Sequence, residues 1–203
     1  PLLALVEEAG FEIEAIFGKR GLVLIRKGDV DLDILCDADS PMDIVSIEGQ
    51  NELAVQGYRH VDMLLDASIS VTVGPDFHAS FDPPVTLRIP TLPAYALGKV
   101  LSARGRTVSR RRVKDLVYVY EVLRQPGSRT ALIERLPGHA ESYPVPTRAA
   151  AEALSEVLAQ KTVLRNAAEQ LRESGRMAGK EDALASLRTH LRRLGDELTR
   201  IIE

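Results

Sequence analysis

The hydrophobic pattern of this 203-residue chain changes near Pro90. Before that point, short apolar segments of strand length are separated by turns rich in glycine and proline. After it, apolar residues recur at steps of three and four, which is typical of amphipathic helices. We therefore expect an α/β (α+β) protein with strands in the first part. Candidate strands are residues 11–17, 30–35, 58–65, 69–73 and 85–89, and the first two helices are expected at 93–104 and 109–123.

Two aspartates lie two residues apart in the candidate strand 30–35. Successive side chains of a strand alternate between faces, so Asp31 and Asp33 are expected on one surface. Neighbouring carboxylates repel each other, and a cation relieves this repulsion. Mg²⁺ is the expected cation because it prefers oxygen ligands. The alternative is that both residues belong to the solvated face of an amphipathic strand.

A third carboxylate follows in the candidate strand 58–65. If this strand is a neighbour of 30–35, Asp62 meets Asp31 and Asp33 at one edge of a sheet. Such a group of carboxylates can hold two metal ions, one against a triphosphate and one against an attacking hydroxyl. Asp66 is the competing residue, but its place at the strand end suggests a turn.

Charge is distributed unevenly along the chain. Residues 1–90 hold 6 Lys and Arg against 16 Asp and Glu, whereas residues 91–203 hold 20 against 13. An acidic half beside a basic half suits a polyphosphate that carries magnesium, and docking surfaces of opposite charge would give the same numbers. The single cysteine, Cys36, excludes an intrachain disulfide and fits a reducing cytoplasm. Without an apolar run of transmembrane length or a secretory signal, we expect a cytoplasmic protein and no membrane.

Several motifs together resemble the DNA polymerase β-like nucleotidyltransferase superfamily, particularly minimal bacterial nucleotidyltransferases and AbiEii-type toxins. They are the alternating hydrophobic and Asp residues at 30–34, Val61-Asp62, and the helical stretches 97–105 and 112–116. The resemblance covers about residues 10–125. It implies a small mixed sheet flanked by helices, with Mg²⁺, a nucleoside triphosphate (NTP) as substrate, and transfer of a nucleotidyl group to a hydroxyl.

The resemblance also implies phosphate contacts. In that superfamily, a lysine on one helix and a basic-Lys-Asp sequence on the next lie near the nucleotide, which corresponds here to Lys99 and Lys114. Alternatively, Lys99 is an exposed helix residue, and the basic run that contains Lys114 is a solvated face or a contact for an RNA backbone. The usual Gly-Gly or Gly-Ser pair is replaced by Gly18-Lys19, followed by Arg20. Lys19 and Arg20 can bind phosphate as charges, or they can mark a site that has lost this geometry.

The last part of the chain is expected to form two long helices. One covers about 148–174, and the other carries leucines at steps of three and four over residues 184–201. An antiparallel hairpin would bury both stripes, and a homodimer would form only if the helices diverged. We thus expect a nucleotidyltransferase-like domain at 1–125 and a helical C-terminal region at 126–203.

Together these observations predict a Mg²⁺-dependent nucleotidyltransferase with Asp31, Asp33 and Asp62 as metal ligands. The alternative is a catalytically inactive module of the same fold that works through its C-terminal helices. The acceptor stays open between RNA such as a tRNA 3′ end, a protein hydroxyl and an antibiotic. A toxin paired with an antitoxin is one biological setting that the resemblance implies.

Overall fold

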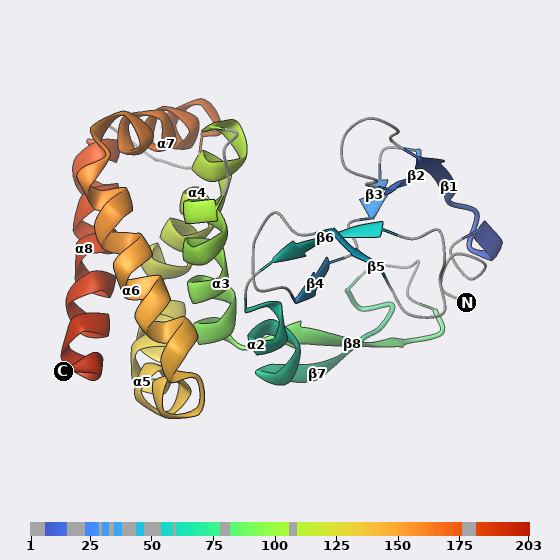
Figure 1. The fold of residues 1–203 in the computed structure, drawn as a ribbon, viewed down its shortest axis with the longest axis horizontal. Coiled ribbons are helices and arrows are strands. Elements are labelled where there is room, and N and C mark those ends of the chain that lie inside the picture. Colours follow the sequence, from blue (N-terminus) through green and yellow to red (C-terminus); the bar gives the residue numbers. More distant parts are fainter. Residues whose placement is uncertain are drawn as a thin grey trace. The chain divides into compact units, whose positions relative to one another are not determined.

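The computed structural model of the chain describes residues 7–15, 23–28, 30–32, 35–37, 44–46, 54–58, 60–77, 82–105, 109–175 and 182–203. Contacts divide the chain into two compact units, Pro1–Asp62 and Met63–Glu203. In the described residues, strands dominate the first unit and helices the second (Figure 1). The expected α+β class is therefore confirmed.

The described strands of the first unit form two small sheets. In one, β1 (Glu12–Ala15), β2 (Val23–Lys27) and β3 (Val30–Leu32) follow one another as antiparallel neighbours. In the other, β6 (Ala54–Tyr58) lies between β4 (Leu35–Asp37), to which it is parallel, and β5 (Ile44–Ser46), to which it is antiparallel. This second sheet is therefore mixed, because it contains one parallel and one antiparallel strand pair.

The strand that carries Asp31 is short and pairs with β2. Its register sets Asp31 opposite Arg26 and Leu32 opposite Ile25, whose side chain is buried. Gly28 joins the two strands with a φ of 57°, in the left-handed region that glycine adopts without a steric penalty. The expected strand over 30–35 is therefore seen at residues 30–32, and Asp33 lies outside the described residues.

Residues 61–66 form a helix, α2 (Val61–Asp66), so the strand expected at 58–65 is wrong beyond Tyr58. Val61 and Met63 are buried, but Leu65, which an alternating strand would bury with them, is 62% exposed. In six residues, the same apolar positions fit a helical turn and a strand almost equally well. Asp62 lies in the first turn of this helix, and Asp66 lies at its end.

An antiparallel ribbon of two strands begins the second unit. It joins β7 (Ser68–Val73) to β8 (Val85–Pro90), close to the strands expected at 69–73 and 85–89. The register pairs Ile69 with Ile89 and Val71 with Leu87, so one face of the ribbon is apolar. On the other face, Thr72 and Thr86 form a hydrogen bond of 3.2 Å between their hydroxyls.

Helices α3 to α8 pack around one hydrophobic core (Figure 1). Their bounds are α3 (Leu92–Gly105), α4 (Ser109–Arg124), α5 (Pro126–Ser142), α6 (Pro144–Ala159), α7 (Lys161–Glu173) and α8 (Ala183–Ile202). The core leucines come from every one of these helices, and each such side chain contributes about 2 kcal/mol when it is fully buried. The first two of these helices agree with the helices expected at 93–104 and 109–123.

Helix α8 is held by its cap and by its leucine stripe. The Asp182 carboxylate accepts hydrogen bonds from the backbone N–H groups of Leu184 and Ala185, which have no partner inside the helix. Four leucines of the stripe are fully buried: Leu187, Leu191, Leu194 and Leu198. The stripe expected over 184–201 thus packs into the protein core.

The segment expected to cover α8 does pack against it, but it does so as two helices, α6 and α7, and α8 also packs against α4 and α5, so the two long helices do not form a separate hairpin. The helix expected over 148–174 is broken at Gln160 into α6 and α7. Figure 1 shows α6 alongside α8, while α7 crosses one end of the bundle, where it packs on α4. A single straight helix could not follow both courses.

The structure also differs from the expected division near residue 125. Helix α4 precedes that point, yet it packs against α5, α7 and α8, which follow it. Helices on both sides of residue 125 contribute to the same core. The contacts instead divide the chain between Asp62 and Met63.

Candidate functional site

The proposed metal ligands differ in how far the structure describes them. The backbone of Asp31 lies in β3, Asp33 lies outside the described residues, and Asp62 is an exposed residue of α2. Because α2 is a helix, Asp62 does not join Asp31 through neighbouring strands. Among the side chains that the structure describes, no group of three or more His, Cys, Asp and Glu could hold a metal ion.

The glycine-containing motif proposed for phosphate binding cannot be placed. Gly18, Lys19 and Arg20 all lie outside the described residues. The two helix lysines are described: Lys99 belongs to α3 and Lys114 to α4. The structure shows the side-chain contacts of these two predicted phosphate ligands.

Lys99 lies beside a buried carboxylate. Its ammonium is 3.5 Å from Asp115 Oδ1, and the Ser102 hydroxyl donates a hydrogen bond of 3.0 Å to Asp115 Oδ2. The Asp115 side chain is 3% exposed and that of Lys99 is 29% exposed. A buried carboxylate requires such partners, since burial of an unpaired charge is costly. The ammonium is thus held at a fixed position while it remains in contact with solvent.

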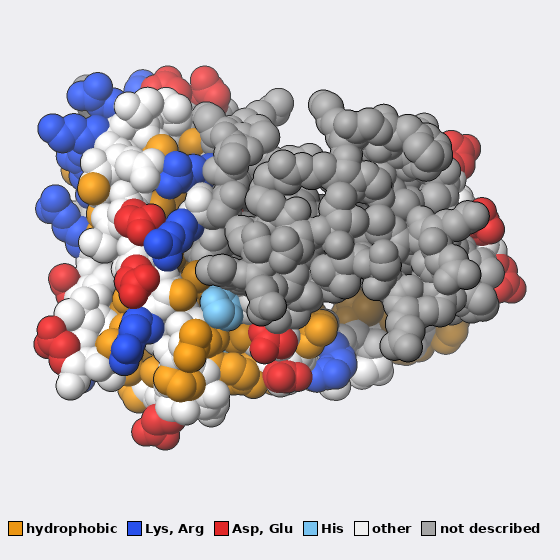
Figure 2. All heavy atoms as spheres, viewed as in Figure 1, with side chains coloured by type: hydrophobic (Ala, Val, Ile, Leu, Met, Phe, Trp, Pro, Cys, Tyr) orange, Lys and Arg blue, Asp and Glu red, His pale blue; other side chains and the backbone are white. Residues whose placement is uncertain are grey.

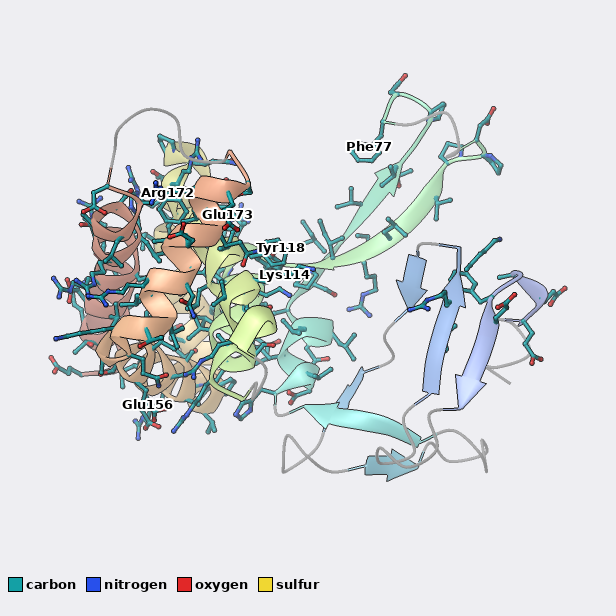
Figure 3. All side chains as sticks on the ribbon, turned by 90° about the horizontal axis from the view of Figure 1, so that it is seen from above. Phe77, Lys114, Tyr118, Glu156, Arg172 and Glu173 are labelled. Carbon is teal, nitrogen blue, oxygen red and sulfur yellow. The ribbon has the colours of Figure 1, made fainter. Side chains whose placement is uncertain are left out.

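Two tyrosine rings contact the lysines of the site. The Lys99 ammonium lies 5.7 Å from the centroid of the Tyr95 ring and 5.4 Å from that of Tyr118. The Lys114 ammonium lies 5.6 Å from the centroid of the same Tyr118 ring. Figure 3 shows Lys114 and Tyr118 next to each other on α4. All three distances fall in the range of cation–π contacts.

Burial raises the pKa of Tyr95 above its ordinary value, and the nearby Tyr118 and Asp115 raise this pKa further. A raised pKa keeps the phenol protonated at neutral pH, so Tyr95 adds no negative charge. Lys99 and Lys114 supply two positive charges, and Asp115 supplies one negative charge. An anion is the ligand that this group of charges favours.

Helix spacing explains how the sequence builds this arrangement. Tyr95 and Lys99 are four residues apart on α3, and Lys114 and Tyr118 are four apart on α4, so each pair lies on one face of its helix. The close packing of α3 on α4 then brings Asp115 to Lys99. We call Tyr95, Lys99, Ser102, Lys114, Asp115 and Tyr118 the α3–α4 cluster.

Gly98 of α3 makes a close contact with Leu64 of α2. A Cβ atom added at Gly98 would lie 2.7 Å from Leu64 Cδ2 of α2, which is closer than such atoms approach. Glycine therefore allows α2 to reach α3 immediately before Lys99. This contact joins α3 to α2 next to the α3–α4 cluster.

Other basic residues belong to exposed helix faces. Figure 2 shows Lys and Arg side chains gathered at the edge formed by α7 and α8. Helix α7 exposes Lys161, Arg165 and Arg172 together with Glu169 and Glu173, and Arg172 forms an ion pair with Glu169. Such mixed charges are typical of a solvated helix surface.

Sequence reasoning missed Ser102, Tyr95, Tyr118 and the pairing role of Asp115. The spacing of four residues between each tyrosine and its lysine was a usable signal, because residues four apart on a helix are neighbours. The Ser102–Asp115 hydrogen bond joins two helices, so it could not be foreseen from spacing within one helix. Lys99 and Lys114, by contrast, were predicted individually and do lie against one ring.

Comparisons with known proteins add no family to this description. No protein-family model matches the chain, and neither the curated proteins nor the solved structures include a match. In the described residues, no helix has both the length and the apolar character needed to cross a membrane. The sequence motifs and the geometry of the α3–α4 cluster are therefore the features that bear on function.

Proposed function

We propose that this protein is a Mg²⁺-dependent nucleotidyltransferase that moves a nucleotidyl group from an NTP to a hydroxyl. In this proposal Asp31, Asp33 and Asp62 bind the metal, and Lys99 and Lys114 contact the phosphates. We also propose that the sheet of the first unit is of the nucleotidyltransferase type. RNA, a protein hydroxyl and an antibiotic are all candidate acceptors, and a toxin role is one setting for the reaction.

The observation that carries the proposal is the position of the Lys99 ammonium. It lies 3.5 Å from the buried Asp115 carboxylate, which itself accepts a hydrogen bond from Ser102. The lysine is thus oriented before any ligand arrives, and a pre-oriented charge stabilises a phosphate without the cost of reorganisation. The resemblance to nucleotidyltransferases predicted both Lys99 and the Lys114-Asp115 pair independently of this geometry.

The proposed metal ligands suit magnesium by their chemistry. Carboxylate oxygens are the ligands that Mg²⁺ prefers, and the Asp62 side chain is exposed on α2. When bound, the metal would neutralise charge on the triphosphate and lower the pKa of the attacking hydroxyl. The carboxylate of Asp62 could accept the proton of that hydroxyl. Lys99 and Lys114 would hold the phosphates during transfer.

Isothermal titration of the full chain with each NTP, with and without MgCl₂, tests this assignment. We expect magnesium-dependent binding that is lost in Asp31→Ala with Asp33→Ala. Lys99→Met should weaken binding about tenfold to a hundredfold, the usual range for a charge-assisted hydrogen bond. Lys161→Met is the matched control, because Lys161 is an exposed lysine of α7. The absence of magnesium-dependent binding, or unchanged binding in the double alanine variant, would contradict the site assignment.

A second candidate function is a catalytically inactive module of the same fold that binds or regulates. The replacement of the usual Gly-Gly or Gly-Ser pair by Gly18-Lys19 favours it. Its expected working surface is the C-terminal helices, and the central leucines of α8 are buried in the core. A partner would therefore have to contact the polar face of α8. Transfer of labelled nucleotide to RNA or protein would exclude the inactive module.

A further inference from the structure

One aromatic ring connects the two lysines of the α3–α4 cluster. The ammonium groups of Lys99 and Lys114 lie 5.4 Å and 5.6 Å from the centroid of the Tyr118 ring. The two lysines come from different helices, so no spacing within one helix fixes their separation. The shared ring brings both lysines to one place on the α3–α4 surface, because each ammonium is attracted to the electron-rich ring system.

The two ammonium groups are not equivalent. Lys99 has a negative partner at 3.5 Å in Asp115 and is 29% exposed. Lys114 is an exposed residue whose ammonium contacts the Tyr118 ring. A single phosphate carries about two negative charges near neutral pH, whereas linked phosphates carry more. Two phosphates joined by a bridging oxygen carry charged oxygens on both sides of the bridge, so they can reach both ammonium groups.

We propose that Tyr118 is a positioning residue that holds Lys99 and Lys114 as one site for polyphosphate. The site then prefers pyrophosphate and tripolyphosphate to a single phosphate. This inference rests on the proposed function in one respect, namely that both lysines contact phosphate. It deepens that function, because it assigns the selection of the triphosphate group to Tyr118, which contacts both lysines.

The effect of Tyr118 follows from the size of a cation–π contact. Each contact at a partly exposed site is worth about a twofold to fivefold change in an equilibrium constant. Loss of the ring removes two such contacts. We therefore expect Tyr118→Leu to weaken tripolyphosphate binding about fivefold to twentyfold. Tyr118→Phe keeps the ring and should bind almost as the unchanged protein does.

The experiment measures binding of inorganic phosphate, pyrophosphate and tripolyphosphate by the full chain in the absence of metal. The unchanged protein should bind tripolyphosphate at least about tenfold more tightly than phosphate, since a second charged contact is added. In Tyr118→Leu this ratio should fall, while phosphate binding changes little. Lys114→Met should lower the same ratio without any change to the ring. Circular dichroism and thermal unfolding establish that the variants are folded.

Three results with the variants would overturn the inference. They are a tripolyphosphate affinity in Tyr118→Leu equal to that of the unchanged protein, an equal loss in Tyr118→Phe and Tyr118→Leu, and an equal loss for phosphate and tripolyphosphate. If Tyr118→Leu does not fold, the inference is tested by the ratio of tripolyphosphate to phosphate affinity. This ratio is then compared between Lys114→Met, Tyr118→Phe and the unchanged protein. The absence of any polyphosphate binding would also overturn it. Failure of the proposed function has a different signature, namely polyphosphate binding without nucleotidyl transfer.

Discussion

The ammonium of Lys99 lies 3.5 Å from the carboxylate of Asp115, and the two partners differ in exposure. Asp115 is buried between α3 and α4, whereas Lys99 reaches solvent. Removal of the lysine therefore leaves a buried charge behind, while removal of both charges does not. This asymmetry makes the pair accessible to a double-mutant cycle.

Lys99→Met should lower the free energy of unfolding by about 1–3 kcal/mol, because it removes the ammonium that lies 3.5 Å from the buried Asp115 carboxylate. Addition of Asp115→Asn should recover most of this loss, since the amide is neutral and its oxygen can still accept the Ser102 hydrogen bond. Urea unfolding measures all three variants, with Lys161→Met as control. A double variant as unstable as Lys99→Met would contradict this account of the pair.

Gly98 and Gly138 should respond oppositely to alanine. Both lie in helices, but a Cβ at Gly98 would meet Leu64 Cδ2 at 2.7 Å, and a Cβ at Gly138 would meet nothing within 4 Å. Alanine in an open helix position stabilises by about 0.5–1 kcal/mol relative to glycine, whereas overpacking costs about 1–3 kcal/mol. We expect thermal unfolding to show that Gly138→Ala is more stable than Gly98→Ala. Addition of Leu64→Ala to Gly98→Ala should remove the steric part of the stability loss. Equal stabilisation by both alanines would show that α2 does not contact α3 in this way.

Stability should depend on pH through His139. This side chain is buried against Tyr143, with ring centroids 4.9 Å apart, and burial lowers the pKa of His139 below its ordinary value. The unfolded chain then binds the proton more tightly than the folded protein, so stability falls as the pH drops through the ordinary pKa of about 6.5. His139→Leu should reduce this loss between pH 7.5 and pH 5. The comparison uses urea unfolding at both values, and an unchanged pH dependence in the variant would remove His139 as the cause.

Much of the helical part could be predicted from periodicity. The leucine stripe over 184–201 and the helices near 93–104 and 109–123 were expected because their apolar residues repeat over several turns. Helix α5 was missed because Pro126-Gly127 suggests the end of a helix. Proline is equally suited to the first helical position, and Pro126 starts α5.

Short segments were harder to predict. Residues 61–66 bury Val61 and Met63 as a strand would, and only the exposed Leu65 distinguishes the helix. The break at Gln160 had no local signal, since neither glycine nor proline marks it; it follows from the packing of α7 across α4. Contacts between distant parts of the chain decide such cases, and a single sequence does not display them.

The two lysines of the candidate site could be predicted one by one, but the cluster that surrounds them could not. Lys99 and Lys114 were expected from their motifs, whereas Ser102 and Tyr118 became evident only when α3 and α4 were packed together. Gly18, Lys19, Arg20 and Asp33 remain predictions, since they lie outside the described residues. The roles of Asp31 and Asp62 as metal ligands also remain predictions.

The most direct test of the proposed function is transfer of a radioactive nucleotide. The full chain is incubated with each α-labelled NTP, MgCl₂ and bulk RNA, and label is followed into RNA and into protein. We predict transfer by the unchanged protein, and a loss of about a hundredfold or more in Asp31→Ala with Asp33→Ala, since loss of a metal contribution costs several kcal/mol. Lys161→Met should transfer normally. Label transfer that persists unchanged in the double alanine variant, or its complete absence from the unchanged protein with every NTP, would contradict the proposed function.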